Sequence, residues 1–157
     1  MRLLKLFVPA IALAGCVAVM AQTPNYGLGR TPTAQEMQAW DIAISPTGAE
    51  LPPGSGIATE GAKIYAQRCA ACHGPTGTEG PRNRLVGGKG TRQINAYQFA
   101  TPLWDIINRS MPLDQQGSLT PDEVYAVTAF LLQRNGFIKE TDVMDAKTLP
   151  KVKMAAH

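Results

Sequence analysis

The stretch Cys69-Ala70-Ala71-Cys72-His73 is the part of the chain from which the rest can be interpreted. Its two thiols lie three positions apart, and residues three and four apart are neighbours on a helical turn. Cys69 and Cys72 can therefore form thioether bonds with the two vinyl groups of one haem, and His73 can bind the haem iron from the adjacent position. The C-x-x-C-H spacing thus predicts covalent attachment of one haem c.

Other sites that use two cysteines at this spacing fit the chain less well. A redox-active C-x-x-C is expected beside alternating strands and helices, and the sequence shows no such alternation. A structural zinc site needs four ligands. Outside the pentapeptide the chain has one cysteine, Cys16, and one histidine, His157, both far away in sequence. The metal predicted for this chain is therefore haem iron.

The first 21 residues are typical of an export signal. Arg2 and Lys5 form a basic start, which a short apolar core follows. A membrane-spanning helix needs about 20 apolar residues, so this segment is too short to be one. Cleavage after Ala21 is one expected outcome. The other is lipidation of Cys16, because the tetrapeptide that ends there resembles a bacterial lipobox. Both alternatives predict the periplasm, where haem is attached to c-type cytochromes.

The charge balance does not indicate a nucleic-acid partner. The whole chain has 15 basic and 12 acidic residues. Removal of residues 1–21 takes away two bases and no acids, which leaves 13 bases against 12 acids. The mature chain is thus nearly neutral, and it lacks a basic run with interleaved aromatic residues, which would indicate nucleic-acid binding.

The remainder of the chain is predicted to hold one domain between two extensions. Residues 22–57 are rich in proline and glycine and are expected to form an irregular N-terminal extension. Within it, Thr33 and Glu36 are spaced as a capping box, which predicts one short helix. Residues 58–137 are expected to form the haem domain. Residues 138–157, with four lysines, form a tail that is either disordered or docked on the domain.

The haem domain is predicted to be all-α, because no stretch in it alternates apolar and polar residues as a strand does. Helices are expected over residues 59–71, 101–110 and 121–135. The last of these has the clearest ends, since Thr120 and Glu123 form a capping box and Gly136 follows the final turn. The glycine-rich residues 74–96 are expected to loop around the haem.

The occupant of the second axial position decides whether a haem protein carries electrons or reacts with a substrate. Outside residues 1–21 the methionines are Met37, Met111, Met144 and Met154. Met111 is the candidate ligand, because it follows a predicted helix, precedes Pro112 and lies far enough after His73 for the chain to pass around the haem edge. A six-coordinate iron has no open position for a substrate. The pair His73 and Met111 therefore predicts an electron carrier without catalytic residues.

Two further groups of residues could serve the haem. A backbone carbonyl near Gly80 and Pro81 could accept the imidazole N–H of His73 and fix its tautomer, or these residues could form an ordinary turn. Four basic side chains could meet the haem propionates or an acidic partner, or could simply be solvated. They are Arg82, Arg84, Lys89 and Arg92.

Several of these features resemble class I c-type cytochromes. The resemblance rests on Gly61 and Tyr65 ahead of the C-x-x-C-H motif, on the segment Arg109–Pro112 around Met111, and on the apolar final helix. It implies a cytochrome c-like helical fold around one covalent haem. It also implies that Gly61 and Tyr65 let the first helix of the domain pack closely against residues 129–131 of the last helix.

A closer resemblance covers most of residues 25–154. It is to the cytochrome c subunits of sulfite dehydrogenase and sulfane dehydrogenase, and it implies a molybdenum-containing catalytic partner and an acceptor cytochrome. It also implies that the extension and the tail wrap the partner. Some relatives carry two haems, whereas this chain has one C-x-x-C-H motif. The similar segments are Tyr26–Arg30, Trp40–Ile42, Leu51–Gly56, Ser110–Leu113, Ser118–Ala126 and Asp145–Met154.

The sequence thus predicts a periplasmic monohaem cytochrome c that is the electron-transfer subunit of a sulfite-type dehydrogenase. One alternative is a diffusible electron carrier without a permanent partner. The other is a five-coordinate haem enzyme or sensor, which would require that Met111 does not bind the iron.

Overall fold

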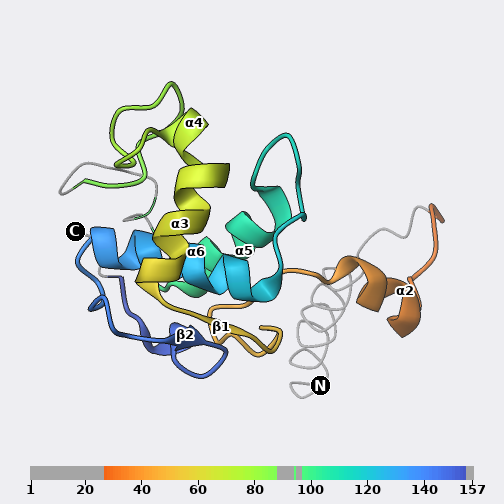
Figure 1. Cartoon of the computed structure of the whole chain (residues 1–157). Coiled ribbons are helices and arrows are strands. Elements are labelled where there is room, and N and C mark those ends of the chain that lie inside the picture. The colour runs from red at the N-terminus through yellow and green to blue at the C-terminus, as the bar shows by residue number, and fades with distance from the viewer. Residues whose placement is uncertain (1–26, 88–93, 95–96, 155–157) are drawn as a thin grey trace, which may run out of the picture. The chain divides into compact units, whose positions relative to one another are not determined.

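The computed structural model describes residues 27–87, 94 and 97–154 (Figure 1). The predicted export signal with Cys16, and also Lys89, Arg92 and His157, lie outside the described residues. The chain divides into two compact units, of which the first ends at Trp40 and the second begins at Asp41. Within the described residues, no helix has the length and apolar character needed to cross a membrane.

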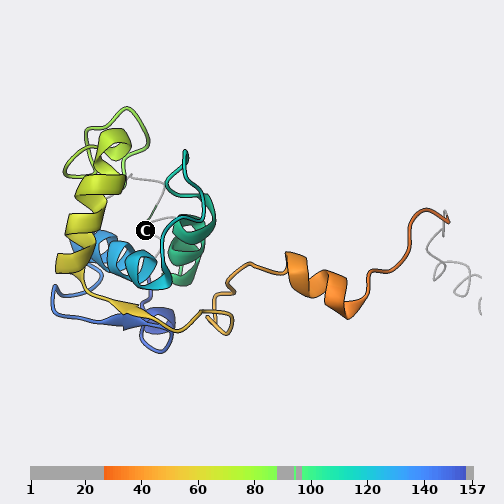
Figure 2. The same ribbon diagram turned by 45° about the vertical axis from the view of Figure 1, so that its right-hand side comes forward.

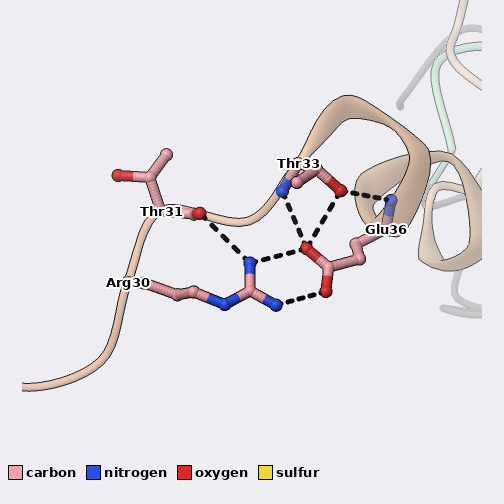
Figure 3. A network of polar contacts seen from close by, with 4 residues as sticks. All are labelled: Arg30, Thr31, Thr33 and Glu36. Atoms are coloured by element: carbon pink, nitrogen blue, oxygen red, sulfur yellow. Dashed lines mark hydrogen bonds and ion pairs between the residues drawn. The ribbon is translucent and has the colours of Figure 1, made fainter.

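The described part of the first unit contains helix α2 (Ala34–Trp40). Figure 3 shows how its N-terminus is capped. The backbone N–H of Glu36 donates to Thr33 Oγ1 at 3.2 Å, and the backbone N–H of Thr33 donates to Glu36 Oε2 at 2.8 Å. The predicted capping box is therefore confirmed. Arg30 forms an ion pair with the same carboxylate, and this pair is the main cause that lowers the pKa of Glu36 to about 2.

The second unit is built from helices and a very small sheet. Its helices are α3 (Ala58–Arg68), α4 (Ala70–His73), α5 (Thr101–Ser110), α6 (Pro121–Arg134) and the 3-10 helix η1 (Leu149–Lys151). The expectation of an all-α domain is confirmed, with one addition: β1 (Ser55–Gly56) pairs antiparallel with β2 (Met144–Asp145). The helix expected over residues 59–71 is divided at Cys69 into α3 and α4.

Helix α6 forms the centre of this unit and has the boundaries that the sequence predicts. The backbone N–H of Thr120 donates to the Glu123 carboxylate at 2.8 Å, and Thr120 Oγ1 accepts from the backbone of Glu123 at 3.4 Å. Gly136, just beyond the helix, takes a φ of 79°, which glycine adopts without strain. Helices α3 and α5 and both strands pack against α6 (Figure 2), and all nine residues from Val124 to Leu132 except Phe130 are buried.

Two glycines pack very closely against Ala126 of α6. A Cβ atom at Gly61 of α3 would lie 1.9 Å from the Ala126 carbonyl oxygen, and one at Gly56 of β1 would lie 2.3 Å from its backbone nitrogen. One turn away from Gly61, the rings of Tyr65 and Phe130 are 4.9 Å apart between centroids. The close α3–α6 packing implied by the resemblance is therefore present, with Gly61 against Ala126 and Tyr65 against Phe130.

Residues 41–57 and the tail are part of the second unit. Leu51, Met144, Leu149 and Met154 are buried in its core. The backbone N–H of Met154 donates to the carbonyl of Gln98 at 2.9 Å. For residues 138–154, the described part of the tail, the structure shows the docked alternative. The compact unit therefore extends on both sides of the predicted domain, residues 58–137, and begins at Asp41.

Candidate haem-binding site

The C-x-x-C-H motif lies where α3 ends and α4 begins. Cys69 leaves the helical conformation with φ −123° and ψ −34°. Its carbonyl accepts hydrogen bonds from the backbone N–H groups of both Cys72 (3.1 Å) and His73 (3.0 Å). This tight turn holds the three residues of the motif together, which is the arrangement that attachment of one haem requires.

Both cysteines of the motif are free thiols. Cys69 is half-buried, whereas Cys72 is exposed. Burial is the main cause that raises the pKa of the Cys69 thiol to about 11, so this side chain is protonated at neutral pH. Two unpaired thiols held on one turn suit thioether formation with the two vinyl groups of a haem.

The imidazole of His73 is held in one orientation by the backbone. Its Nδ1 lies 2.8 Å from the carbonyl oxygen of Asn83. Because a carbonyl oxygen only accepts hydrogen bonds, Nδ1 carries the proton and Nε2 is left with a lone pair that can bind a metal. The sequence predicted such a carbonyl near Gly80 and Pro81, and the structure places it slightly later in the same turn, at Asn83.

The loop after His73 is tied back to the motif by several hydrogen bonds. The backbone N–H of Arg82 donates to the Cys72 carbonyl at 2.9 Å. The buried Tyr65 hydroxyl donates to the Gly74 carbonyl at 3.0 Å, and this contact was not predicted from the sequence, because only the tertiary structure shows which carbonyl the hydroxyl reaches. These bonds fix the start of the loop that carries Asn83, and so they support the orientation of His73.

The carboxylate of Glu79 organises the same loop. Hydrogen bonds from the Thr76 hydroxyl and from the backbone N–H of Thr78 lower the pKa of Glu79 to about 2. Because its folded-state pKa lies below the ordinary value of 4.5, Glu79 stabilises the fold above about pH 4.5 and loses this effect as the pH falls through 2. The pKa is lowered because the hydrogen bonds stabilise the ionised carboxylate, which accepts all of them.

A Glu79→Gln variant should therefore unfold at lower urea concentration than the wild-type protein at pH 7. The difference should shrink as the pH falls from 4.5 towards 2, because the wild-type carboxylate then becomes neutral as well. Urea unfolding at a series of pH values measures it. Glu140→Gln, at an exposed glutamate outside this loop, is the control. A difference that is constant across this pH range would contradict the assignment.

Met111 lies at the C-terminal end of α5, where its backbone N–H donates to the Ile107 carbonyl at 3.1 Å. Its side chain is half-buried and packs against the core. In both ribbon views, α4 and the segment after α5 lie at the same end of the second unit (Figures 1 and 2). The side of the domain that carries His73 and the segment that carries Met111 can thus serve one cofactor, and ligation by Met111 stays a prediction.

The indole of Trp104 gives an independent test of whether a haem fits this part of the chain. Trp104, on α5 before Met111, is 1% exposed, and its ring packs against Tyr125 with centroids 5.3 Å apart. Its Nε1 is buried and has no hydrogen-bond partner among the described residues. A buried N–H without a partner is costly, and an oxygen-bearing cofactor such as haem, with two propionates, offers acceptors. The residues present therefore fit a covalent haem.

The basic side chains considered for the propionates are exposed where they are described. Arg84 Nε donates to the carbonyl of Thr78 at 3.2 Å, and Arg82 is also exposed. For Arg82 and Arg84, contact with the haem propionates and simple solvation both stay open as predictions. Among the described residues there is also no cluster of three or more histidine, cysteine or acidic side chains that would hold a separate metal ion.

Comparison with known proteins agrees with this geometry. The family model for cytochrome c matches residues 58–135. A chain in the crystal structure of the sulfane dehydrogenase SoxCD from Paracoccus pantotrophus is similar with a TM-score of 0.70 and 33% identity, over 83% of this chain and 68% of that chain. Thiosulfate dehydrogenase of Stutzerimonas stutzeri (strain A1501) is 29% identical over 120 residues.

The three matches differ in how much they cover. The alignment with thiosulfate dehydrogenase spans 59% of this chain but only 35% of the relative. The match with the SoxCD chain reaches well beyond the 78 residues of the family model, because it takes in 83% of this chain. Residues 58–135 are thus a cytochrome c domain with covalently bound haem c, and the chain belongs to the cytochrome c family.

Proposed function

We propose that this protein is a periplasmic monohaem cytochrome c that accepts electrons from a molybdenum-containing dehydrogenase of sulfite or a related sulfur compound and passes them to another cytochrome. The observation that carries the proposal is the similarity to the SoxCD chain over 83% of this chain. Because that similarity includes residues outside the cytochrome c domain, it supports a shared role in a dehydrogenase complex beyond a shared fold.

The residues around the haem have distinct roles in this proposal. Cys69 and Cys72 hold the haem covalently, and His73 binds its iron through Nε2 while the Asn83 carbonyl fixes the ring. Haem c supplies a one-electron couple between ferric and ferrous iron. Met111 would be the second ligand of the iron, and as a thioether it would favour the ferrous state and so raise the potential. With His73 and Met111 both bound to it, the iron would have no open position for a substrate, which suits electron transfer.

A Met111→Ala variant should have a lower potential than the wild-type protein, by on the order of 0.1 V, since axial ligands set haem potentials across about 0.8 V. The ferrous variant should also bind carbon monoxide, because one axial position is open. Redox titration and absorption spectra measure both effects. Met37→Ala is the matched control, at an exposed methionine of α2. A potential within error of the wild type would contradict ligation by Met111.

The location and the N-terminus can be tested on the same preparation. We infer export to the periplasm, with removal of residues 1–21 as the expected processing and a lipid anchor on Cys16 as the alternative. Cell fractionation locates the protein, and mass spectrometry of the intact mature chain separates the two N-termini. A mature chain that begins at Gln22 excludes the lipid anchor, and a chain that still begins at Met1 contradicts export with cleavage.

Isolation under mild conditions distinguishes a subunit from a diffusible carrier. An affinity tag placed after His157 should copurify a larger subunit that contains molybdenum, in a fixed ratio to the haem. Addition of sulfite or another reduced sulfur compound should then reduce the haem. Recovery of the cytochrome without a molybdenum-containing partner, from cells that oxidise these compounds, would favour the diffusible carrier.

A second candidate follows from the similarity to thiosulfate dehydrogenase. A protein related to that enzyme could itself oxidise a sulfur compound at a five-coordinate haem. The isolated chain would then be reduced by thiosulfate without a partner, and its iron would bind carbon monoxide in the wild type. Reduction only in the presence of the catalytic partner would support the subunit instead.

A further inference from the structure

We propose that Arg68 is a positioning residue that holds the Met111 segment closed over the haem. Arg68 is the last residue of α3 and directly precedes Cys69. Its guanidinium reaches the loop of residues 112–119, which follows Met111. This inference rests on the proposed ligation of the iron by Met111. It adds a residue from the helix that leads into the haem-attachment motif, and this residue acts on the segment that carries Met111.

The contact is made by a single guanidinium nitrogen and two loop side chains. Arg68 Nη2 donates to Gln115 Oε1 at 2.9 Å and to Ser118 Oγ at 2.6 Å. Gln115 and Ser118 belong to one turn, because the backbone N–H of Ser118 donates to the Gln115 carbonyl at 3.2 Å. A single arginine side chain therefore binds a turn that its own backbone hydrogen bond already closes.

In the described part of the chain, no other hydrogen bond joins these two segments. Between residues 58–86, which carry the haem-attachment motif, and residues 101–119, which carry Met111, the two bonds of Arg68 are the only ones. Helices α3 and α5 each pack on α6. Arg68 thus supplies the only direct hydrogen bonds between these two described segments, which are otherwise linked through their packing on α6.

The loop itself has few contacts that would hold it in place. Pro112 and Leu119, at its two ends, are buried, whereas the residues between them are exposed. A Cβ atom at Gly117 would have no neighbour within 4 Å. Segments with few buried contacts open at low cost in free energy. Because Met111 directly precedes this loop, opening of the loop withdraws the sixth ligand, and Arg68 opposes that opening.

The test measures how fast imidazole replaces Met111 on the ferric iron of the full haem-loaded protein. An Arg68→Met variant keeps the length of the side chain but cannot donate hydrogen bonds. We expect imidazole to bind about fivefold faster, the factor that a contact of roughly 1 kcal/mol at an exposed site gives. The potential should shift only slightly, because Met111 still binds in the closed state.

Two further variants separate the proposed role from general effects. Lys63→Met removes a positive charge from an exposed position of the same helix and should leave the imidazole rate unchanged. A Gln115→Ala, Ser118→Ala double variant removes the acceptors and should accelerate binding as much as Arg68→Met does. Combining the two changes should give no further acceleration, because both remove the same contact.

The outcomes are distinct for this inference and for the proposed site. If the wild-type protein lacks the upfield NMR methyl signal of an iron-bound methionine, ligation by Met111 is wrong and the inference falls with it. If that signal is present and Arg68→Met binds imidazole at the wild-type rate, only the role of Arg68 is overturned. Equal acceleration in Lys63→Met would also overturn it, since charge alone would then explain the effect.

Discussion

A variant in which Cys69 and Cys72 are both alanine should contain no covalently attached haem. The two thiols are the only cysteine side chains on the turn that carries His73, and both are unpaired. Without them, a haem is held by its axial ligands and by apolar contacts alone, and these contacts break when the protein unfolds. After denaturation and acid–acetone extraction, the variant protein should show no haem absorbance, whereas the wild-type protein should keep all of it.

The chain offers a matched control for this experiment. Cys16→Ala changes the remaining cysteine, which lies in the predicted export signal, and should leave haem attachment intact in any protein that reaches the periplasm. The single variants should each keep one thioether bond and retain haem through extraction. Loss of attached haem in Cys16→Ala protein that has been exported, or attachment in the double variant, would contradict the assignment.

Replacing Gly61 with alanine should strongly destabilise the domain, because the added methyl group has no room. The new Cβ would lie 1.9 Å from the Ala126 carbonyl oxygen and 2.9 Å from Phe130 Cβ. Both neighbours belong to the central helix α6, and a backbone carbonyl cannot rotate away as a side chain can. Alanine normally favours a helix over glycine by about 1 kcal/mol, but overpacking a close helix contact costs about 1–3 kcal/mol or more.

The net effect expected for Gly61→Ala is a lower free energy of unfolding, by about 2 kcal/mol, and a Tm lower by roughly 10 °C. Thermal unfolding followed by circular dichroism measures it in the haem-loaded protein. Ala66→Ser also adds one non-hydrogen atom to α3, but at an exposed position, so its Tm should stay within about 2 °C of the wild type. A Gly61→Ala protein as stable as the wild type would show that α3 and α6 can move apart.

Some elements could be predicted from the sequence almost to the residue, because their signals are local. Thr120, Pro121 and Glu123 define the start of α6 by contacts within one turn, and the structure contains the same capping box. Helix α5 covers residues 101–110 as predicted. The capping box of α2 is equally local and is also confirmed. Each of these features depends on neighbours only three or four positions away.

Other features could not be read from local patterns, because their partners lie far away in the sequence. The composition of the tail is compatible with either disorder or docking, yet Leu149 and Met154 are completely buried. Strand β1 gains its partner only when β2, from the tail, reaches it. Residues 41–57 looked irregular because proline and glycine are frequent there, but irregular backbone can still dock on a core. Long-range packing thus places both extensions.

The candidate site likewise combines features that the sequence predicts with features that only the tertiary structure shows. Spacing alone predicts the two cysteines and His73 as the residues that bind the haem, since the chemistry of haem attachment needs those groups within one turn. The sequence also pointed to a carbonyl acceptor for the imidazole, but the tertiary structure placed it at Asn83. The contact of Arg68 with Gln115 and Ser118 joins residues almost fifty positions apart, and no periodicity or motif signals it.

By itself, then, the sequence determined the cofactor, because covalent haem attachment requires a fixed local order of side chains, and it determined the helices whose caps are local. Only the tertiary structure decided which carbonyl orients His73, how closely α3 approaches α6, and which residue joins the two halves of the site. The physical reason is that hydrogen bonds and packing between distant segments depend on the fold of the whole chain. The geometry of a five-residue motif depends only on its own backbone and side chains.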